Sequence, residues 1–421
     1  MTLATERLVD RIVEAAVTRA VAGGRGMLHG LGGRSLVDAV GAFFPLTTAK
    51  VLAHETRGAL EKKELKIGFV PVACATPLLL AEPMGFYALQ GLKAVLVKAP
   101  GWGLVRDLAI GGQCQASHML APMPLALRLG PGPQRDPMRV VSLQGGSGQA
   151  ITLHLKHRDR RDPRQWQGMK LAVPFECSMH DLLLRYYLAE HGLDPDRDVQ
   201  IRVVPPAGLL AALRSGSIDG YLGPEPFNQR AVHDGVGFIH ALSSDLWDGH
   251  PCCAFAVSES FVKENPNTFA ALFRAVATAT AHAQEPDNRA EIARSIAGAS
   301  YLDQPVSVVE QVLTGRFGDG LGNARHVPER AVFAAFPWHS MAVWILTQLK
   351  RWGYVKGDFD YHAVAEEVFL ATDARKRLAE MGVAAPERTY ARHRIMGKTF
   401  DPARPDEYVR SFRIPRREPV V

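Results

Sequence analysis

The chain has 421 residues, of which 47% are hydrophobic and 22% are charged, and its formal net charge at pH 7 is +6. This is an ordinary globular composition, long enough for two lobes, and no apolar run reaches the length of a helical membrane span. The basic balance suits an anionic ligand or an anionic membrane surface, and it equally fits arginines spread over the surface. Any membrane association is therefore expected to be peripheral.

The cysteines show neither the spacing of a metal site nor an obvious disulfide framework. There are five of them: Cys74, Cys114, Cys177, Cys252 and Cys253. We interpret them as small buried residues and expect no bound metal and no cofactor.

Residues 1–64 allow two interpretations. A moderately apolar segment over residues 36–46 follows Arg25, and Val51-Leu52-Ala53 resembles a small-residue cleavage site, which favours a degenerate export signal. Arg34 and Asp38 interrupt the apolar segment. The alternative is a helical arm that is retained in a cytoplasmic protein.

Residues 65–129 alternate between strand and helix patterns. An apolar, β-branched run over residues 65–72 is followed by Thr76 and Pro77, which suit a helix start, and a second strand is predicted over residues 94–98. Alternating strand and helix at this spacing requires parallel pairing, so the carboxyl ends of the strands should lie together, where small ligands bind in open sheets. His118 is predicted at the end of a third strand, either shaping a pocket or packing near a hinge.

The next region turns the chain toward a second lobe. Residues 138–155 predict two strand segments around a glycine cluster, which matches no phosphate-binding loop. Residues 156–167 form a basic run, but Asp159 and Asp162 interrupt it and no aromatic platform accompanies it. A solvated face is the better interpretation, and we expect no nucleic-acid partner.

A second strand and helix pair is predicted at residues 170–191. Ser178 is a suitable N-cap for a helix over residues 179–191, and Gly192 can end it. His180 then falls in the first helical turn, where an imidazole can donate to an anion. A satisfied surface histidine is the alternative.

A series of short motifs follows the same order along the chain: KIGFVPV, GFYALQGL, GWGLVRD, HMLAPMPLAL, GQAIT, SMHDLLLRYYLAEHGLDPDRDV, VVPP, EPFNQRAV, GVGF, LWDGHP and WILTQLKRWG, with FDPARPDEYVRSF near the end. In these motifs, over roughly residues 65–355, the chain resembles the nitrate- and bicarbonate-binding proteins of bacterial ABC importers, which are related to aliphatic-sulfonate and thiamine-precursor binding proteins. The resemblance implies an α/β, two-lobe, type II periplasmic-binding-protein fold with parallel sheets flanked by helices and a hinge between the lobes.

This fold implies a division of the chain. We expect an N-terminal arm at residues 1–64, the first part of lobe 1 at 65–129, the crossover and lobe 2 at 130–245, the return to lobe 1 with a helical cover at 246–355, and a C-terminal extension at 356–421. The hinge is expected where the chain crosses between lobes, near residues 122–131 and 223–227.

The resemblance also implies ligand-binding residues. It places a pocket tryptophan at Trp102, a pocket glutamine at Gln149 and a ligand-contacting histidine at His180. It places a glutamate between the lobes at Glu225, which could control the closing of the two lobes through a hydrogen bond. From the residues alone, a core tryptophan, a loop glutamine and a helix-capping glutamate remain the alternatives.

Cys253 marks a departure from these relatives. The nitrate binder has a ligand-contacting lysine at the position of Cys253, so the resemblance makes Cys253 a ligand-binding position without the charge. A lysine beside a monoanion contributes a charge-assisted hydrogen bond of about 1.5–3 kcal/mol. Its absence weakens the case for nitrate relative to other small anions.

These features predict a receptor that binds a small anion, most similar to nitrate, nitrite or bicarbonate, and delivers it to an ABC permease from the periplasm or from the cell membrane. The alternative is a cytoplasmic nitrate or nitrite sensor of the same fold that controls a regulatory partner. No catalytic motif such as G-x-S-x-G or H-E-x-x-H is present, so we do not predict an enzyme. An iron-dependent thiamine-precursor synthase shares this fold class, but it carries a longer cysteine run.

Overall fold

The computed structural model describes residues 58–130, 137–334 and 336–414. The segment interpreted above as an export signal or a helical arm therefore lies outside the described residues. Within the described residues, no helix is both long enough and apolar enough to cross a membrane.

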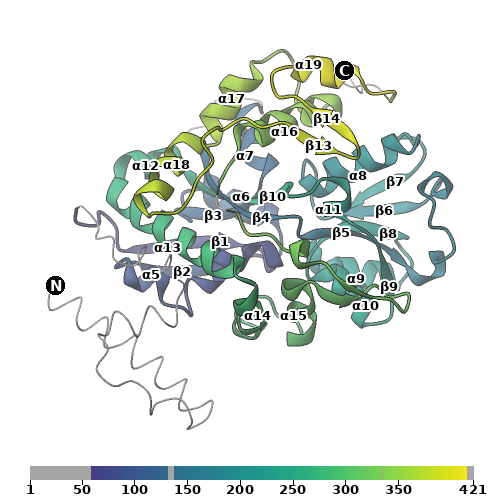
Figure 1. Cartoon of the computed structure of the whole chain (residues 1–421), viewed down its shortest axis with the longest axis horizontal. Coiled ribbons are helices and arrows are strands. Elements are labelled where there is room, and N and C mark those ends of the chain that lie inside the picture. Colours follow the sequence, from purple (N-terminus) through teal and green to yellow (C-terminus); the bar gives the residue numbers. More distant parts are fainter. Residues whose placement is uncertain (1–57, 131–136, 335, 415–421) are drawn as a thin grey trace, which may run out of the picture.

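Two five-stranded sheets form the centres of two lobes (Figure 1). The first sheet has the order β2-β1-β3-β10-β4, and its strands are β1 (Glu64–Phe69), β2 (Lys93–Lys98), β3 (Ala116–Leu120), β4 (Met138–Gly146) and β10 (Pro251–Ser258). Its early helices are α4 (Thr76–Leu80), α5 (Phe86–Leu89), α6 (Trp102–Ile110) and α7 (Pro122–Arg128). The parallel pairing predicted from alternating strands and helices is confirmed for β1 with β2 and β3, whereas β10 pairs antiparallel with β3 and β4.

The second sheet has the order β7-β6-β8-β5-β9. Its strands are β5 (Gln149–His154), β6 (Lys170–Val173), β7 (Gln200–Val203), β8 (Gly220–Pro224) and β9 (Gly237–Leu242), and its helices are α8 (Met179–Glu190), α9 (Pro206–Arg214) and α10 (Phe227–His233). Helix α8 begins as predicted, because the Ser178 hydroxyl accepts from the backbone N–H of Asp181 at 3.1 Å. Gly192 follows it with φ of 81°, the left-handed conformation that suits the end of a helix.

The chain passes between the two sheets twice. The first passage is residues 147–148, between β4 and β5, and the second runs through α11 (Ser243–Leu246) from β9 to β10.

The expected hinge positions were wrong: residues 122–128 form α7, and residues 223–227 connect β8 to α10 within the second lobe. The turn-rich sequence after α7 suggested a crossover, but the chain first adds β4 to the first sheet. The first lobe therefore extends beyond residue 129, and the other expected boundaries stay a prediction.

The rest of the chain is mainly helical. It contains α12 (Glu259–Glu264), α13 (Pro266–Gln284), α14 (Arg289–Ile296), α15 (Val306–Thr314), α16 (His339–Arg351), α17 (Tyr361–Val368), α18 (Ala371–Glu380) and α19 (Pro405–Arg410), with two short hairpins, β11 (Arg316–Gly318) with β12 (Ala324–His326) and β13 (His393–Ile395) with β14 (Lys398–Phe400). Helix α13 packs on α4 and α5 and so covers the first lobe.

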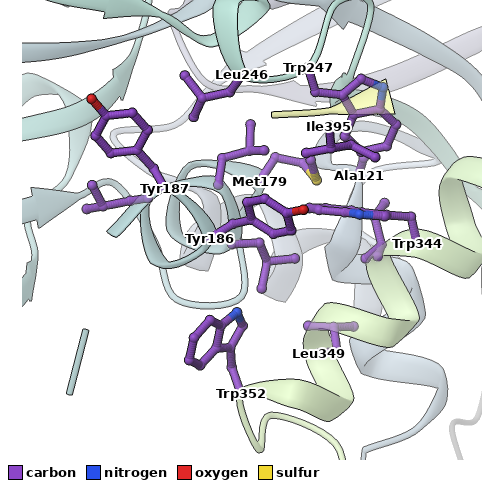
Figure 2. Close-up of a cluster of buried hydrophobic side chains, with 14 of the residues drawn as sticks. Ala121, Met179, Tyr186, Tyr187, Leu246, Trp247, Trp344, Leu349, Trp352 and Ile395 are labelled. Carbon is purple, nitrogen blue, oxygen red and sulfur yellow. The ribbon is translucent and has the colours of Figure 1, made fainter. Parts of the chain in front are cut away.

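Helix α16 packs where the lobes adjoin (Figure 1). Its buried Trp344 belongs to one core cluster with Ala121 of the first lobe and with Met179 and Tyr186 of the second (Figure 2). The Trp344 indole N–H donates to the Tyr408 hydroxyl at 3.3 Å, and that hydroxyl lies 3.0 Å from the Tyr186 hydroxyl. The C-terminal region thus ties the two lobes together on this side.

Candidate functional site

Two aromatic side chains face each other between the lobes. Trp102 is the first residue of α6 in the first lobe, and His180 lies in the first turn of α8 in the second lobe. Their ring centroids are 6.0 Å apart, and their exposed fractions are 1% and 0%. One buried aromatic side chain from each lobe therefore lies at the same contact between the lobes.

These side chains carry polar atoms without partners. The ring of His118, from β3, lies 6.2 Å from that of Trp102. Among the described residues, neither ring nitrogen of His118 or His180 has a hydrogen-bond partner, and neither does Nε1 of Trp102. Buried polar atoms are nearly always satisfied, so this convergence of unsatisfied groups indicates a position for a polar ligand or for water.

Gln149, which directly follows the first passage between the sheets, is a further buried polar residue in this region. It is the first residue of β5 and is fully buried. Its Nε2 donates to Sγ of Cys252 at 2.9 Å, while its Oε1 has no partner in the described part of the chain. The predicted residues Trp102, Gln149 and His180 are therefore brought to the same region where the lobes meet, although their role as ligand contacts stays a prediction.

A network of hydrogen bonds connects the two passages between the lobes. The Ser243 hydroxyl donates to the carbonyls of Ser147 and Gln149 at 3.1 and 3.0 Å. Nε2 of His250 lies 2.8 Å from the same hydroxyl. Because Ser243 belongs to the second passage and Ser147 to the first, this network fixes the position of Gln149 relative to both.

The predicted residue Cys253 lies in a group of three thiols. Its Sγ is 3.6 Å from that of Cys252, which is 3.2 Å from Sγ of Cys74. Cys252 stands beside Cys253 in the sequence, whereas the approach of Cys74 was not predicted. One signal could have identified Cys74, because it follows the end of β1, where the parallel sheet places functional side chains.

The imidazoles carry little positive charge in the closed state. Burial lowers the pKa of His118 and of His180 to about 4, so both rings are neutral at pH 7. Burial alone would raise the pKa of Cys252, but hydrogen bonds from Cys253 and Cys74 outweigh it and hold that pKa well below the usual range of a thiol. The donors that line the space are consequently an indole, an amide and two neutral imidazoles.

The carboxylate of Glu225 is occupied by other partners. Arg330 donates to its Oε1 at 2.5 Å, the backbone N–H of Gln229 donates to its Oε2 at 3.2 Å, and both charged side chains are fully buried. The Glu225 carbonyl accepts from the backbone N–H of Ala73 in the first lobe at 2.7 Å. Glu225 therefore lies where the lobes contact each other, and its side chain does not join the unsatisfied group.

A separate cavity of about 800 Å³ lies near α16 and α18 and is lined by residues that include His339, Phe369 and Arg375. None of its lining residues belongs to the group around Trp102. We place the candidate site between the lobes because the buried, unsatisfied polar atoms converge there.

Comparisons with known proteins agree with this fold. Residues 58–297 match the model of the NMT1-like family. The chain belongs to this family. The nitrate/nitrite binding protein NrtA of Synechococcus elongatus is 30% identical to this chain over 383 residues, which cover 83% of this chain and 86% of that protein. The nitrate/nitrite binding protein NrtA of Nostoc is 28% identical over 385 residues, covering 84% and 87%.

The solved structures confirm the two-lobe fold. The crystal structure of the periplasmic nitrate-binding protein NrtA from Synechocystis superimposes with a TM-score of 0.82 at 27% identity, covering 85% of this chain and all of that one. The alkanesulfonate-binding protein SsuA from Xanthomonas axonopodis, at 20% identity and a TM-score of 0.51, shares the fold. The predicted periplasmic-binding-protein-like architecture of this NMT1-like chain is thus confirmed.

Proposed function

We propose that this chain is the solute-binding receptor of an ABC importer and that it binds a small anion of the nitrate, nitrite or bicarbonate class between its two lobes. The observation that carries this proposal is the convergence of Trp102, His118 and His180 with unsatisfied polar nitrogens in one enclosed space. The names of the relatives, nitrate/nitrite binding proteins and a bicarbonate-binding protein, support the ligand class.

Each side chain contributes a distinct interaction. The indole N–H of Trp102 can donate to one oxygen of the anion while its ring forms a wall of the space. The imidazoles of His118 and His180 can each donate an N–H, and the amide of Gln149 can exchange its contact with Cys252 for a ligand oxygen. An oxyanion enclosed by several donors needs no cofactor for recognition, and binding alone accounts for the proposed activity.

The remaining parts of the proposal follow from the receptor role. We place the protein in the periplasm or at the cell membrane, and we assign it an ABC permease as its partner. The bicarbonate transport ATP-binding protein CmpC of Synechocystis, 34% identical over 338 residues that cover 76% of this chain and 50% of that protein, supports a transport role. Glu225 would control the closing of the lobes, because its carbonyl accepts a hydrogen bond from Ala73 of the first lobe.

The proposal is tested by titrating the purified chain with nitrate, nitrite, bicarbonate and a small organic sulfonate, monitored by calorimetry and thermal shift. A bound anion at 100 times its dissociation constant should stabilise the fold by about 2.7 kcal/mol. Trp102→Phe removes the indole donor and keeps most of the ring volume, so it should weaken binding. Trp166→Phe is the matched control, because the Trp166 indole donates to the Arg160 carbonyl in the second lobe. If no anion in the panel stabilises the protein, the proposed ligand class is wrong.

A further inference from the structure

The three thiols beside the candidate site lie close enough to act together. Cys74 comes from the short helix η1 (Ala73–Ala75), and Cys252 and Cys253 come from β10. Their sulfur atoms all lie within 4.8 Å of one another, and the exposed fractions are 4%, 0% and 0%. Among the described residues, this is the group of histidine, cysteine and acidic side chains whose geometry could hold a metal ion.

We propose that Cys74, Cys252 and Cys253 bind a soft, thiophilic metal ion of the Zn²⁺ or Cu⁺ type through three sulfur ligands. Thiolate ligands select such ions over hard cations such as Mg²⁺ or Ca²⁺, which prefer oxygen. This inference does not depend on the anion proposal, because the thiols could hold a metal whichever solute binds between the lobes.

The sulfur positions already approach the required geometry. Zinc–sulfur bonds of about 2.3 Å in a tetrahedral site place two sulfurs about 3.8 Å apart. The present Cys74–Cys252 and Cys252–Cys253 sulfur distances are 3.2 and 3.6 Å. Shifts of a few tenths of an ångström, within the reach of cysteine side-chain rotations, would therefore suffice for these two pairs.

Local backbone features bring the thiols together. Successive residues of a regular strand point to opposite faces, but the pairing of β10 with β4 is irregular on both sides of Cys253. Such a bulge re-aims side chains, which explains why Cys252 and Cys253 can approach each other. Across from them, a Cβ at Gly145 would lie 2.8 Å from Cβ of Cys74. The glycine thus gives Cys74 room to sit against β4.

The surroundings suit a metal with one open ligand position. Gln149 donates to Sγ of Cys252, the kind of hydrogen bond that stabilises a metal-bound thiolate. Three thiolates around a divalent ion leave a net charge of −1, and water or a small solute can occupy the fourth position.

The test uses the reduced, metal-free full chain, kept anaerobic and titrated with Co²⁺. We expect one Co²⁺ per chain, an intense sulfur-to-cobalt charge-transfer absorption in the near ultraviolet, and its loss when Zn²⁺ displaces the cobalt. Cys74→Ser and Cys252→Ser should each abolish this absorption, while Cys114→Ser, a buried cysteine outside the cluster, should keep it. Absorption that persists in both cluster variants would overturn the proposal.

A second measurement avoids variants that fail to fold. X-ray absorption on the zinc-loaded wild-type chain should show about three sulfur neighbours at about 2.3 Å. A zinc environment of nitrogen and oxygen alone, or a wild-type chain that binds no Co²⁺ after reduction, would refute a thiolate site. Since neither assay contains nitrate or bicarbonate, these results are independent of the anion titrations.

Discussion

The indole of Trp102 and the imidazole of His180 approach to 6.0 Å between ring centroids although they belong to different lobes. Neither side chain has a hydrogen-bond partner for its ring nitrogens within the described chain. Because one ring comes from each lobe, a separation of the lobes would break up this pair. The unpaired ring nitrogens therefore belong to the closed state, where a polar ligand could satisfy them.

His180→Ala should weaken anion binding by more than tenfold, because it removes one donor from an enclosed site where each hydrogen bond to a charged ligand contributes about 1.5–3 kcal/mol. Calorimetric titration with the best anion of the panel measures the effect. His393→Ala is a matched control, since His393 is a largely buried histidine of the C-terminal region whose ring contacts Ser340. Equal affinities of the parent and the His180 variant would contradict the proposed contact.

Anion binding should be accompanied by proton uptake. Burial holds the pKa of His118 and His180 at about 4 in the closed, ligand-free protein, and a neighbouring anion favours the protonated ring and so raises these values. Affinity should therefore increase as the pH falls from 7 toward 5. Binding heats measured in two buffers with different ionisation enthalpies give the number of protons taken up. No difference between the buffers would mean that both imidazoles stay neutral donors.

The ligand-free protein should lose stability on acidification below about pH 6.5. The folded pKa of His180 lies near 4 and the ordinary value is 6.5, so between these values the unfolded chain binds more protons. Its contribution is fully present above pH 6.5 and declines, by at most about 1.4 kcal/mol per pH unit, as the pH falls to 4. Urea unfolding of the parent and of His180→Gln at pH 7 and pH 5 tests this. The variant should lose less stability between the two pH values, and an identical loss would exclude His180 as a contributor.

Arg330→Met should destabilise the fold by about 3–5 kcal/mol, because it leaves the fully buried Glu225 carboxylate without its charged partner. Denaturant unfolding measures the change. Lys93→Met is the comparison, since it breaks an exposed pair with Glu64 and should change stability little. If Arg330→Met unfolds like the parent, the ion pair does not stabilise the fold.

Cys253→Lys tests the departure from the nitrate-binding relatives. The introduced ammonium would be buried among thiols, so the ligand-free variant should melt at a lower temperature than the parent. Nitrate should raise its melting temperature more than it raises that of the parent, and more at low than at high salt, because the anion would compensate the charge. A folded variant that nitrate does not stabilise beyond the parent would show that Cys253 does not face the anion.

The alternation of strands and helices was sufficient to predict the parallel cores of both lobes, because a helix between two strands returns the chain to the edge where the first strand began. The start of α8 at Ser178 and its end before Gly192 could also be predicted from the sequence. A serine hydroxyl caps a helix, and glycine adopts a positive φ, and both effects are local. The resemblance, and not the local pattern, pointed to Trp102 and Gln149, whose residue types alone also fit a core and a loop.

The crossings between the lobes, the group of thiols and the partner of Glu225 depend on contacts between residues far apart in the sequence, which no local pattern encodes. Strand β4 joins the first sheet through its partner β10, which follows more than a hundred residues later, so the crossing could not be placed from the turn residues near α7. For the same reason the approach of Cys74 to Cys252, separated by 178 positions, was invisible in cysteine spacing. The partner of Glu225, Arg330, is 105 positions away.

The connection of both lobes through α16 has a further consequence for how a solute enters. With Trp344 and Tyr186 in one core on that side, the lobes cannot separate there without exposing large aromatic surfaces. Trp102 and Val105 of the first lobe share a second core cluster with Leu209 and Tyr221 of the second lobe. This second cluster must separate when the lobes part, whereas the cluster around Trp344 is tied further by the hydrogen bonds of the Tyr408 hydroxyl. We therefore expect the lobes to part on the Trp102 side and to admit the solute there, while the aromatic cluster around Trp344 stays intact.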